Sequence, residues 1–276
     1  MSMLLTILLS ITVITLLVLF KSEFKKVRFY IKFYFYYVTL SIVPLIIMPY
    51  LLMKPKHHSN GPITSRYMRD IANFVYGWEW QIRNKEILME DRGAVIISNH
   101  QSVFDSTGIN NVWVVAKKIL LIAKKELLLY SGPLGLAMYL CGTIFINRKN
   151  QKEAYQKLEL TKQLMIQENY KTWIFPEGTR NMKYDGKLLP FKKGAFNLAV
   201  TAQVPIIPVV YSPYYFFDKD KYIFDKGRLI LQCLEPVPTV GLTMDDVPAL
   251  TERLHQIISR TYEQLSKEVL SDSRGK

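Results

Sequence analysis

The stretch Ala94-Val95-Ile96-Ile97-Ser98-Asn99-His100-Gln101-Ser102-Val103-Phe104-Asp105 changes from apolar to polar at Ser98. Its apolar half is typical of a buried strand, so His100 is expected just beyond the carboxyl end of that strand, where open α/β sheets place functional groups. Asp105 follows five residues later. A turn between the two lets its carboxylate hydrogen-bond one ring nitrogen of His100 and leaves the other nitrogen as an acceptor. The pattern predicts a base that takes a proton from a hydroxyl group.

A structural role for the same two residues is the alternative. His100 can satisfy the start of a helix, with Asp105 as a solvated residue in the first turn of that helix. A histidine followed five residues later by an aspartate is a short pattern that also occurs by chance. The pattern therefore needs support from elsewhere in the chain.

That support comes from Phe175-Pro176-Glu177-Gly178-Thr179-Arg180. A strand is expected just before it, and Gly178 permits a tight turn that directs backbone N–H groups, Thr179 and Arg180 towards one point. The planar guanidinium of Arg180 suits a phosphate, and Glu177 can either hold that guanidinium or accept from a substrate hydroxyl. The alternative is a surface turn with an ion pair between Glu177 and Arg180 that adds little stability.

Two further stretches complete a set of four blocks: Gly142-Thr143-Ile144-Phe145-Ile146-Asn147-Arg148 and Val204-Pro205-Ile206-Ile207-Pro208-Val209-Val210. In this order and at this spacing, the four blocks resemble the glycerolipid acyltransferases over roughly residues 70–235. The Asn-His-Gln-Ser and Glu-Gly-Thr-Arg-Asn forms are most similar to the 1-acylglycerol-3-phosphate acyltransferases. Four blocks in register are specific, because chance seldom produces them together.

The resemblance implies a fold and an activity. The fold is a glycerolphosphate-acyltransferase-like αβ sandwich with amino-terminal membrane-embedded helices. The activity is transfer of a fatty acyl group from acyl-coenzyme A to the sn-2 hydroxyl of 1-acylglycerol-3-phosphate (lysophosphatidic acid), which gives phosphatidic acid. In the family a lysine near Lys124 helps to hold the phosphate, and Lys124 fits that pattern best.

Several positive side chains are candidates for binding the phosphate of the acceptor. Arg180 is the first choice, and Arg148 and Lys193 follow it, although either can equally be structural or face coenzyme A. A phosphate held at a fixed distance from His100 sets the position of the acceptor hydroxyl. The predicted substrate-binding residues are Glu177, Gly178, Thr179, Arg180, Lys124, Arg148 and Lys193.

The predicted catalytic residues are His100 and Asp105, because a hydroxyl that attacks a thioester needs a base within hydrogen-bond reach. His100 is one of four histidines and the one in a suitable place, and Asp105 fixes its tautomer. A Ser-His-Asp triad that uses Ser102 or Ser98 and forms an acyl-enzyme is the alternative. A serine two residues from its base on the same turn is poorly aimed, and the resemblance implies direct transfer.

Composition sets further limits. The chain has 276 residues, 49% of them hydrophobic, enough for one sizeable core plus an appendage. Its net charge is +13, but no nucleic-acid-binding signature accompanies it. The charge suits anionic lipid, a phosphorylated substrate or coenzyme A, with a solvated face as the alternative for much of it. Cys141 and Cys233 lack a paired spacing, and His100 and Asp105 lack a third metal ligand. We expect no disulfide, no metal and no cofactor other than acyl-coenzyme A as co-substrate.

Residues 1–58 are expected to anchor the chain in a membrane through two hydrophobic segments, about 3–20 and 33–53. The first segment has 18 consecutive uncharged residues, close to the ~20 that span a bilayer as a helix. A cleaved signal peptide is the alternative, but no basic region precedes the segment and Val18-Leu19-Phe20 is a poor cleavage site.

Charge predicts the orientation of the anchor. By the positive-inside rule, the basic flank of the first segment lies in the cytosol and the amino terminus in the lumen. Pro44 and Pro49 favour a second segment that breaks, re-enters and returns to the same face, with an ordinary second span as the alternative. We predict an integral membrane protein of the endoplasmic reticulum with a cytosol-facing catalytic domain. The flanking basic residues are Lys21, Lys25, Lys26, Arg28 and Lys32 before the second segment and Lys54 and Lys56 after it.

Residues 59–270 are expected to form the catalytic domain, an α/β sandwich, with residues 271–276 as a flexible tail. Helices are predicted at 151–168 and, as an amphipathic stripe, at about 250–269. The apolar stretch 127–140 is interrupted by glycine and proline, so burial in the core is expected, with an acyl tunnel or contact with lipid as the alternative. Strands are predicted at 94–98, 119–123, 142–146, 172–175, 206–211 and 228–234.

Two other functions are compatible with parts of this pattern. An acyltransferase for another acceptor, such as glycerol-3-phosphate or a lysophospholipid with a larger head group, would use the same base; Asn181 after Arg180 favours lysophosphatidic acid. A non-catalytic membrane lipid-binding protein would keep the fold without the chemistry. The intact set of His100, Asp105, Glu177 and Arg180 argues against it.

Overall fold

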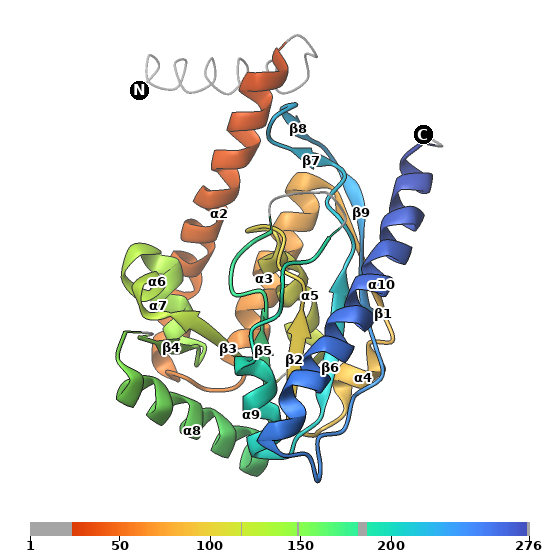
Figure 1. Cartoon of the computed structure of the whole chain (residues 1–276). Helices are drawn as coiled ribbons and strands as arrows, with labels where there is room; N and C mark the ends of the chain where they lie inside the picture. Colours follow the sequence, from red (N-terminus) through yellow and green to blue (C-terminus); the bar gives the residue numbers. More distant parts are fainter. Residues whose placement is uncertain (1–23, 117, 148, 182–186, 275–276) are drawn as a thin grey trace.

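The computed structural model describes residues 24–116, 118–147, 149–181 and 187–274 (Figure 1). The first hydrophobic segment, expected at residues 3–20, and the predicted phosphate ligand Arg148 lie outside these ranges. The described chain forms a predominantly parallel sheet with helices on both faces. The predicted α/β class is confirmed.

Seven strands form the central sheet in the order β1-β9-β6-β2-β5-β3-β4. Neighbours are parallel except β6 and β9, which are antiparallel. The carboxyl ends of β2, β5, β3 and β4 therefore meet at one edge. The strands are β1 Trp78–Arg83, β2 Ala94–Ser98, β3 Ile119–Lys124, β4 Ile144–Ile146, β5 Lys171–Ile174, β6 Ile206–Tyr211 and β9 Gly227–Cys233, and a separate antiparallel pair is β7 Phe217–Asp218 with β8 Ile223–Phe224.

All six strands predicted from the sequence are present, and their bounds agree within two residues. Strand β1 and the β7-β8 pair were not predicted. In β1, Trp78, Trp80 and Ile82 alternate with polar residues, a period of two that is typical of a strand. This strand signal is present in the sequence and was missed.

Strand residues alternate between two cores, one on each face of the sheet. On β2, Val95 and Ile97 belong to a core completed by α9 and α10. Ala94 and Ile96 belong to a second core completed by α4, α5, α7 and the end of α2. Because β2 is buried on both faces, its sequence reads as a continuous apolar run.

The helices after α2 cover both faces of the sheet (Figure 1). The helix predicted at 151–168 is present with these bounds, and the amphipathic helix at the end of the chain continues through Arg274, into the stretch expected to form a flexible tail. The helices are α3 Asn60–Tyr76, α4 Glu86–Met89, α5 Asp105–Ala116, α6 Lys125–Tyr130, α7 Pro133–Leu140, α8 Gln151–Glu168, α9 Gly194–Ala202 and α10 Val247–Arg274, with a 3₁₀ turn at Met244–Asp246.

The second hydrophobic segment forms one continuous helix, α2 (Lys25–Met53), with Pro44 and Pro49 inside it. The predicted break is therefore wrong. A proline removes an intrahelical hydrogen bond and favours a kink, but α2 packs against α3 and α7, and these contacts offset that cost. Among the described helices, α2 is the one long and apolar enough to cross a membrane.

Both ends of α2 contact the part of the chain that carries the central sheet. Near its start, Lys32 Nζ donates to the carbonyl of Phe224 at 2.7 Å. Beyond its end, the Lys56 N–H donates to the carbonyl of Leu140 at 2.7 Å. The chain therefore enters and leaves α2 on the same body, although it does so along one continuous helix rather than a broken one.

A cluster of buried aromatic side chains joins α2 to the rest of the protein. Tyr36 of α2 lies edge-on to Phe104 with ring centroids 4.9 Å apart, and Phe104 packs on Trp78 of β1 at 5.1 Å. Phe29 of α2 packs on Phe217 of β7 at 5.6 Å. Helix α2 is thus part of a core that also includes the segment between His100 and Asp105.

Candidate active site

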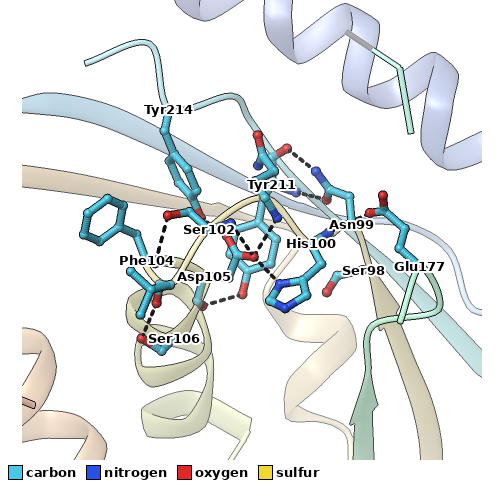
Figure 2. Close-up of polar contacts among 12 residues, drawn as sticks. Ser98, Asn99, His100, Ser102, Phe104, Asp105, Ser106, Glu177, Tyr211 and Tyr214 are labelled. Carbon is cyan, nitrogen blue, oxygen red and sulfur yellow. Dashed lines mark hydrogen bonds and ion pairs between the residues drawn. The ribbon is translucent and has the colours of Figure 1, made fainter. Parts of the chain in front are cut away.

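His100 lies two residues beyond β2, and Asp105 is the first residue of α5. His100 Nδ1 and Asp105 Oδ2 are 2.6 Å apart (Figure 2). The Asp105 side chain is 1% exposed and that of His100 is 19% exposed. The predicted contact is therefore present. Nδ1 must donate to the carboxylate, and Nε2, which has no hydrogen-bond partner among the described residues, can accept a proton.

The Asp105 carboxylate is fixed by further donors. Its Oδ2 also accepts the N–H groups of Gln101 at 2.8 Å and Ser102 at 3.2 Å. Its Oδ1 accepts the hydroxyl of Tyr214 at 2.5 Å. Burial and the neighbouring Asp105 raise the pKa of Tyr214 well above its usual value, so that hydroxyl stays protonated and donates. With its carboxylate held in this way, Asp105 fixes both the tautomer and the direction of the imidazole ring.

We name residues 99–104 the histidine loop and residues 175–181 the arginine loop. The main chain of His100 joins them: its N–H donates to Glu177 Oε1 at 2.7 Å, and its carbonyl accepts the N–H of Asn181 at 2.7 Å. The two loops are therefore held side by side at the carboxyl ends of β2 and β5.

Glu177 does not have either of its predicted roles. Its Oε2 accepts the N–H of Leu189 at 2.9 Å, so both carboxylate oxygens are bonded to the main chain, and the residue is 2% exposed. Burial raises the pKa of Glu177 although both N–H donors oppose that shift. Glu177 does not pair with Arg180, and it does not line the cavity next to His100 that is described below. It positions His100 instead.

The turn that follows Glu177 is built as predicted, but its N–H groups are used differently. Gly178 has φ +71°, a left-handed conformation that glycine adopts readily. Its N–H bonds the carbonyl of Phe175 at 3.0 Å and is therefore not available to an anion. Thr179 and Arg180 are exposed, and Arg180 shares a cavity with His100.

Two other predicted phosphate ligands, Lys124 and Lys193, lie at the same edge of the molecule. Lys124 is exposed at the end of β3, and β5 separates β3 from β2, so its main chain is roughly 10 Å from the end of β2 at ~4.8 Å per strand. Lys193 is exposed and immediately precedes α9. Neither residue lines the cavity that contains His100.

Neither serine near the histidine is placed as a nucleophile. The Ser98 hydroxyl is buried and accepts from Trp173 Nε1 at 2.9 Å. Ser102 Oγ accepts the N–H of Phe104 at 3.4 Å. Since neither hydroxyl contacts His100, the geometry does not support the covalent alternative.

A cavity of about 460 Å³ adjoins the dyad. His100, Asp105 and Arg180 line it together with side chains of α2, α3, α5, α6 and α7, most of them apolar, such as Leu40, Met68 and Trp113. The stretch 127–140 is therefore not simply core: Leu127, Tyr130 and Leu134 line this cavity. A space of this size with few polar groups is typical of a ligand site.

Comparison with known proteins identifies the family. The Acyltransferase family model matches residues 79–212. The 1-acyl-sn-glycerol-3-phosphate acyltransferase beta of Homo sapiens is 46% identical over 209 residues, which cover 75% of this chain and 73% of that protein. The alpha protein of Homo sapiens is 36% identical over 249 residues, 90% of this chain and 84% of that protein. The chain belongs to the 1-acyl-sn-glycerol-3-phosphate acyltransferases.

The crystal structure of the 1-acyl-sn-glycerophosphate acyltransferase PlsC from Thermotoga maritima shares the fold of this acyltransferase. The two chains superpose with a TM-score of 0.61 at 21% sequence identity, over 87% of this chain and 97% of the other. The likeness extends over almost all of the bacterial protein. It therefore supports the layered α/β architecture as a whole.

Three residues of the acyltransferase site escaped the sequence prediction. Phe175, the first residue of the second motif, stacks on the His100 ring with centroids 4.0 Å apart and planes at 17°. Tyr214 bonds Asp105 from far along the chain, and no local pattern marks it. Lys192 lies over the glycine turn, because a Cβ at Gly178 would come within 2.8 Å of its Nζ.

Proposed function

We propose that this acyltransferase transfers a fatty acyl group from acyl-coenzyme A to the sn-2 hydroxyl of 1-acylglycerol-3-phosphate and thus forms phosphatidic acid. The observation that carries the proposal is the buried pair of Asp105 and His100 beside an apolar cavity that Arg180 also lines. The reaction needs a base, a cation for phosphate and room for an alkyl chain. The names of the relatives support the choice of acceptor.

The chemistry follows from the fixed direction of the imidazole. His100 Nε2 removes the proton from the acceptor hydroxyl while the oxygen attacks the thioester carbonyl carbon. Asp105 stabilises the imidazolium that forms. Collapse of the tetrahedral intermediate breaks the carbon–sulfur bond, and the imidazolium returns the proton to the departing thiolate. An ester and a thiol replace an alcohol and a thioester, and the base contributes roughly 10²- to 10⁴-fold to the rate.

The phosphate of the acceptor is assigned to Arg180, whose planar fork can bind two phosphate oxygens at once. Arg180 is tied to the base through the arginine loop, since Asn181 bonds the carbonyl of His100. This link gives the phosphate and the reacting hydroxyl a defined separation. Lys124, Lys193 and Arg148 are assigned supporting roles towards the phosphates of the acceptor or coenzyme A.

We also propose that the protein resides in the endoplasmic reticulum membrane with its catalytic domain in the cytosol. Basic residues at the start of α2 contact the catalytic domain: Arg28 lies 3.6 Å from Asp225, and Lys32 bonds Phe224. Because basic flanks stay in the cytosol, this contact supports a cytosolic domain. In sealed microsomes, added protease should digest the domain and spare a tag on Met1; a protected domain would overturn this orientation.

The activity is tested with the purified full chain, labelled acyl-coenzyme A and a panel of acceptors: lysophosphatidic acid, glycerol-3-phosphate and lysophosphatidylcholine. We expect the highest kcat/KM with lysophosphatidic acid, and a loss of roughly 10³-fold or more in His100→Ala. His58→Ala, an exposed histidine outside the cavity, is the matched control. Preference for another acceptor would overturn the substrate, and transfer only from an acylated carrier protein would overturn the donor.

A further inference from the structure

We propose that helices α6 and α7 form a second membrane contact, which dips into the head-group layer of an anionic phospholipid bilayer and opens the catalytic cavity towards the lipid. The proposal rests on the proposed function, because it concerns how lipid substrates reach that site. Its occupant is the lipid surface itself rather than a protein partner.

Helix α6 and the turn that follows it, here called the tip of this helix pair, expose large apolar side chains. No residue of α6 is buried, and Leu129 is 77% and Tyr130 is 85% exposed. A soluble protein rarely presents such neighbouring apolar side chains to water without a partner. Tyrosine is also enriched where a bilayer meets water, because its ring is apolar and its hydroxyl stays hydrated.

The structure at both ends of α7 holds the tip in position. Gly132 has φ +54° and makes the turn into α7, which begins with Pro133. At the other end of α7, the Leu140 carbonyl accepts Asn60 Nδ2 at 2.9 Å as well as the N–H of Lys56. Ala137 and Leu140 are buried. The turn at Gly132 and the packed end of α7 therefore hold the apolar tip at the surface of the protein.

The exposed tip continues an apolar surface on α2, which packs side by side with α7 (Figure 1). One face of α2 is buried against the domain. The rest carries large apolar side chains that are at least two-fifths exposed: Tyr34, Phe35, Tyr37, Val38, Ile42, Leu45, Ile46, Tyr50, Leu52 and Met53. A lipid surface that receives α2 can thus receive α6 and α7 beside it.

Exposed basic residues lie next to α6 and at the end of α2. Lys124 immediately precedes α6, and Lys54 and Lys56 follow α2; all three are exposed. The Lys56 ammonium lies 4.2 Å from the centre of the Tyr139 ring, which keeps positive charge next to the apolar surface. Apolar side chains with a basic border match the two layers of an anionic membrane surface, acyl chains below and head groups above.

The same tip connects to the cavity of the active site. Leu127 and Tyr130 of α6 and Ser131 in the turn line the cavity that His100 and Arg180 also line. A lipid with one chain in the bilayer can therefore pass along α6 while its phosphate remains at the surface. The acceptor would reach His100 without leaving the membrane.

A fluorescent label at position 129 tests the contact. Leu129→Cys in the full chain is labelled with an environment-sensitive dye, reconstituted into vesicles of equal parts phosphatidylcholine and phosphatidylserine, and exposed to lipids with nitroxide-bearing acyl chains. Val240→Cys is the matched control, because Val240 is 76% exposed in the turn after Val237, which pairs with the start of β6. The unmodified chain gives the background, since Cys141 and Cys233 are buried.

We expect quenching and a blue shift at position 129 and neither at position 240. Leu129→Glu should lower the rate with lysophosphatidic acid carried in these vesicles by about tenfold. It should leave the rate with a short-chain monomeric acceptor unchanged. Val240→Glu should change neither rate. If the label at position 129 shows no more quenching and no more blue shift than the label at position 240, the proposal is overturned. Quenching at 129 in a chain that transfers no acyl group would instead overturn the proposed function and leave the membrane contact standing.

Discussion

The histidine loop and the arginine loop share an edge of the sheet but differ in how firmly they are held. In the histidine loop, Asn99 is buried and bonds both the carbonyl and the N–H of Tyr211, at 3.1 and 2.8 Å. Gln101, also buried, donates to the carbonyl of Ser212 at 3.0 Å. In the arginine loop burial ends at Glu177, and Thr179 and Arg180 are exposed.

The difference matches the two tasks proposed for these loops. A base contributes only when it lies within hydrogen-bond reach of the proton it removes, so its loop is fixed. A residue that binds the head group of a lipid must admit and release it, so its loop is open. Changes in the histidine loop should therefore lower kcat, and changes in the exposed part of the arginine loop should raise KM.

After His100→Ala, the largest effect is expected for Asp105→Asn. An amide at this position can donate to the imidazole and favours the wrong tautomer, so kcat should fall roughly 10³- to 10⁴-fold with little change in KM. Steady-state kinetics with lysophosphatidic acid measures both constants. Asp91→Asn, in an exposed carboxylate 3.6 Å from Lys118, is the control. A rise in KM at constant kcat would mean that Asp105 acts on substrate binding instead of orienting the base.

Glu177→Gln should come next, with kcat lower by roughly 10² because a shift of about 1 Å in a positioning group can cost that much. The glutamine amide would face one of the two N–H groups, of His100 or Leu189, that the carboxylate now accepts. His100→Ala provides the floor for comparison. An unchanged kcat, with a higher KM for the acceptor alone, would return Glu177 to its predicted contact with substrate.

The same variant has a signature in the pH dependence of stability. Because burial raises the pKa of Glu177, this carboxyl contributes stability that is present below its unfolded-state pKa and is lost as the pH rises through its folded-state pKa. Glutamine does not titrate. The stability advantage of the wild type over Glu177→Gln should therefore narrow between acid and neutral pH, as measured by thermal unfolding in detergent.

For Arg180→Lys we expect the opposite kinetic pattern. A point charge replaces a two-pronged donor, so KM for lysophosphatidic acid should rise about tenfold while kcat stays within about twofold. Arg66→Lys, an exposed arginine of α3, controls for the loss of a surface guanidinium. If the KM for acyl-coenzyme A changes instead, Arg180 contacts the acyl donor and not the acceptor.

The smallest effect is expected for Tyr214→Phe, which removes one donor from Asp105 and keeps the buried ring. The carboxylate then stabilises the imidazolium more strongly, so the acid limb of the kcat profile should move to higher pH, with a loss of a few-fold at neutral pH. The titratable and charged groups around the dyad are Tyr36, Tyr211, Glu177 and Arg180, and the variant leaves them all in place. An unmoved profile would limit Tyr214 to packing.

The parts of this protein that could be predicted are those with a local pattern. Apolar runs gave the strands of the sheet, and the spacing of His100 and Asp105 gave a contact that the structure contains. Glu177 was misjudged because its partner Leu189 lies beyond a turn whose path no local pattern shows. Tyr214 reaches Asp105 across more than a hundred residues, 109 in all. Pro44 and Pro49 misled because the contacts that keep α2 continuous are tertiary.

Helix α2 has a consequence for how this protein can be cut and recombined. It supplies side chains to the cavity wall, such as Tyr37 and Leu40, and it seats Tyr36 against Phe104 inside the histidine loop. A shortened chain that begins after residue 58 would not be a soluble enzyme freed from its tether, because it would lack part of its own core. Exchanging α2 with that of a relative would replace part of the cavity wall together with the helix that is long and apolar enough to cross a membrane, so both features would change at once.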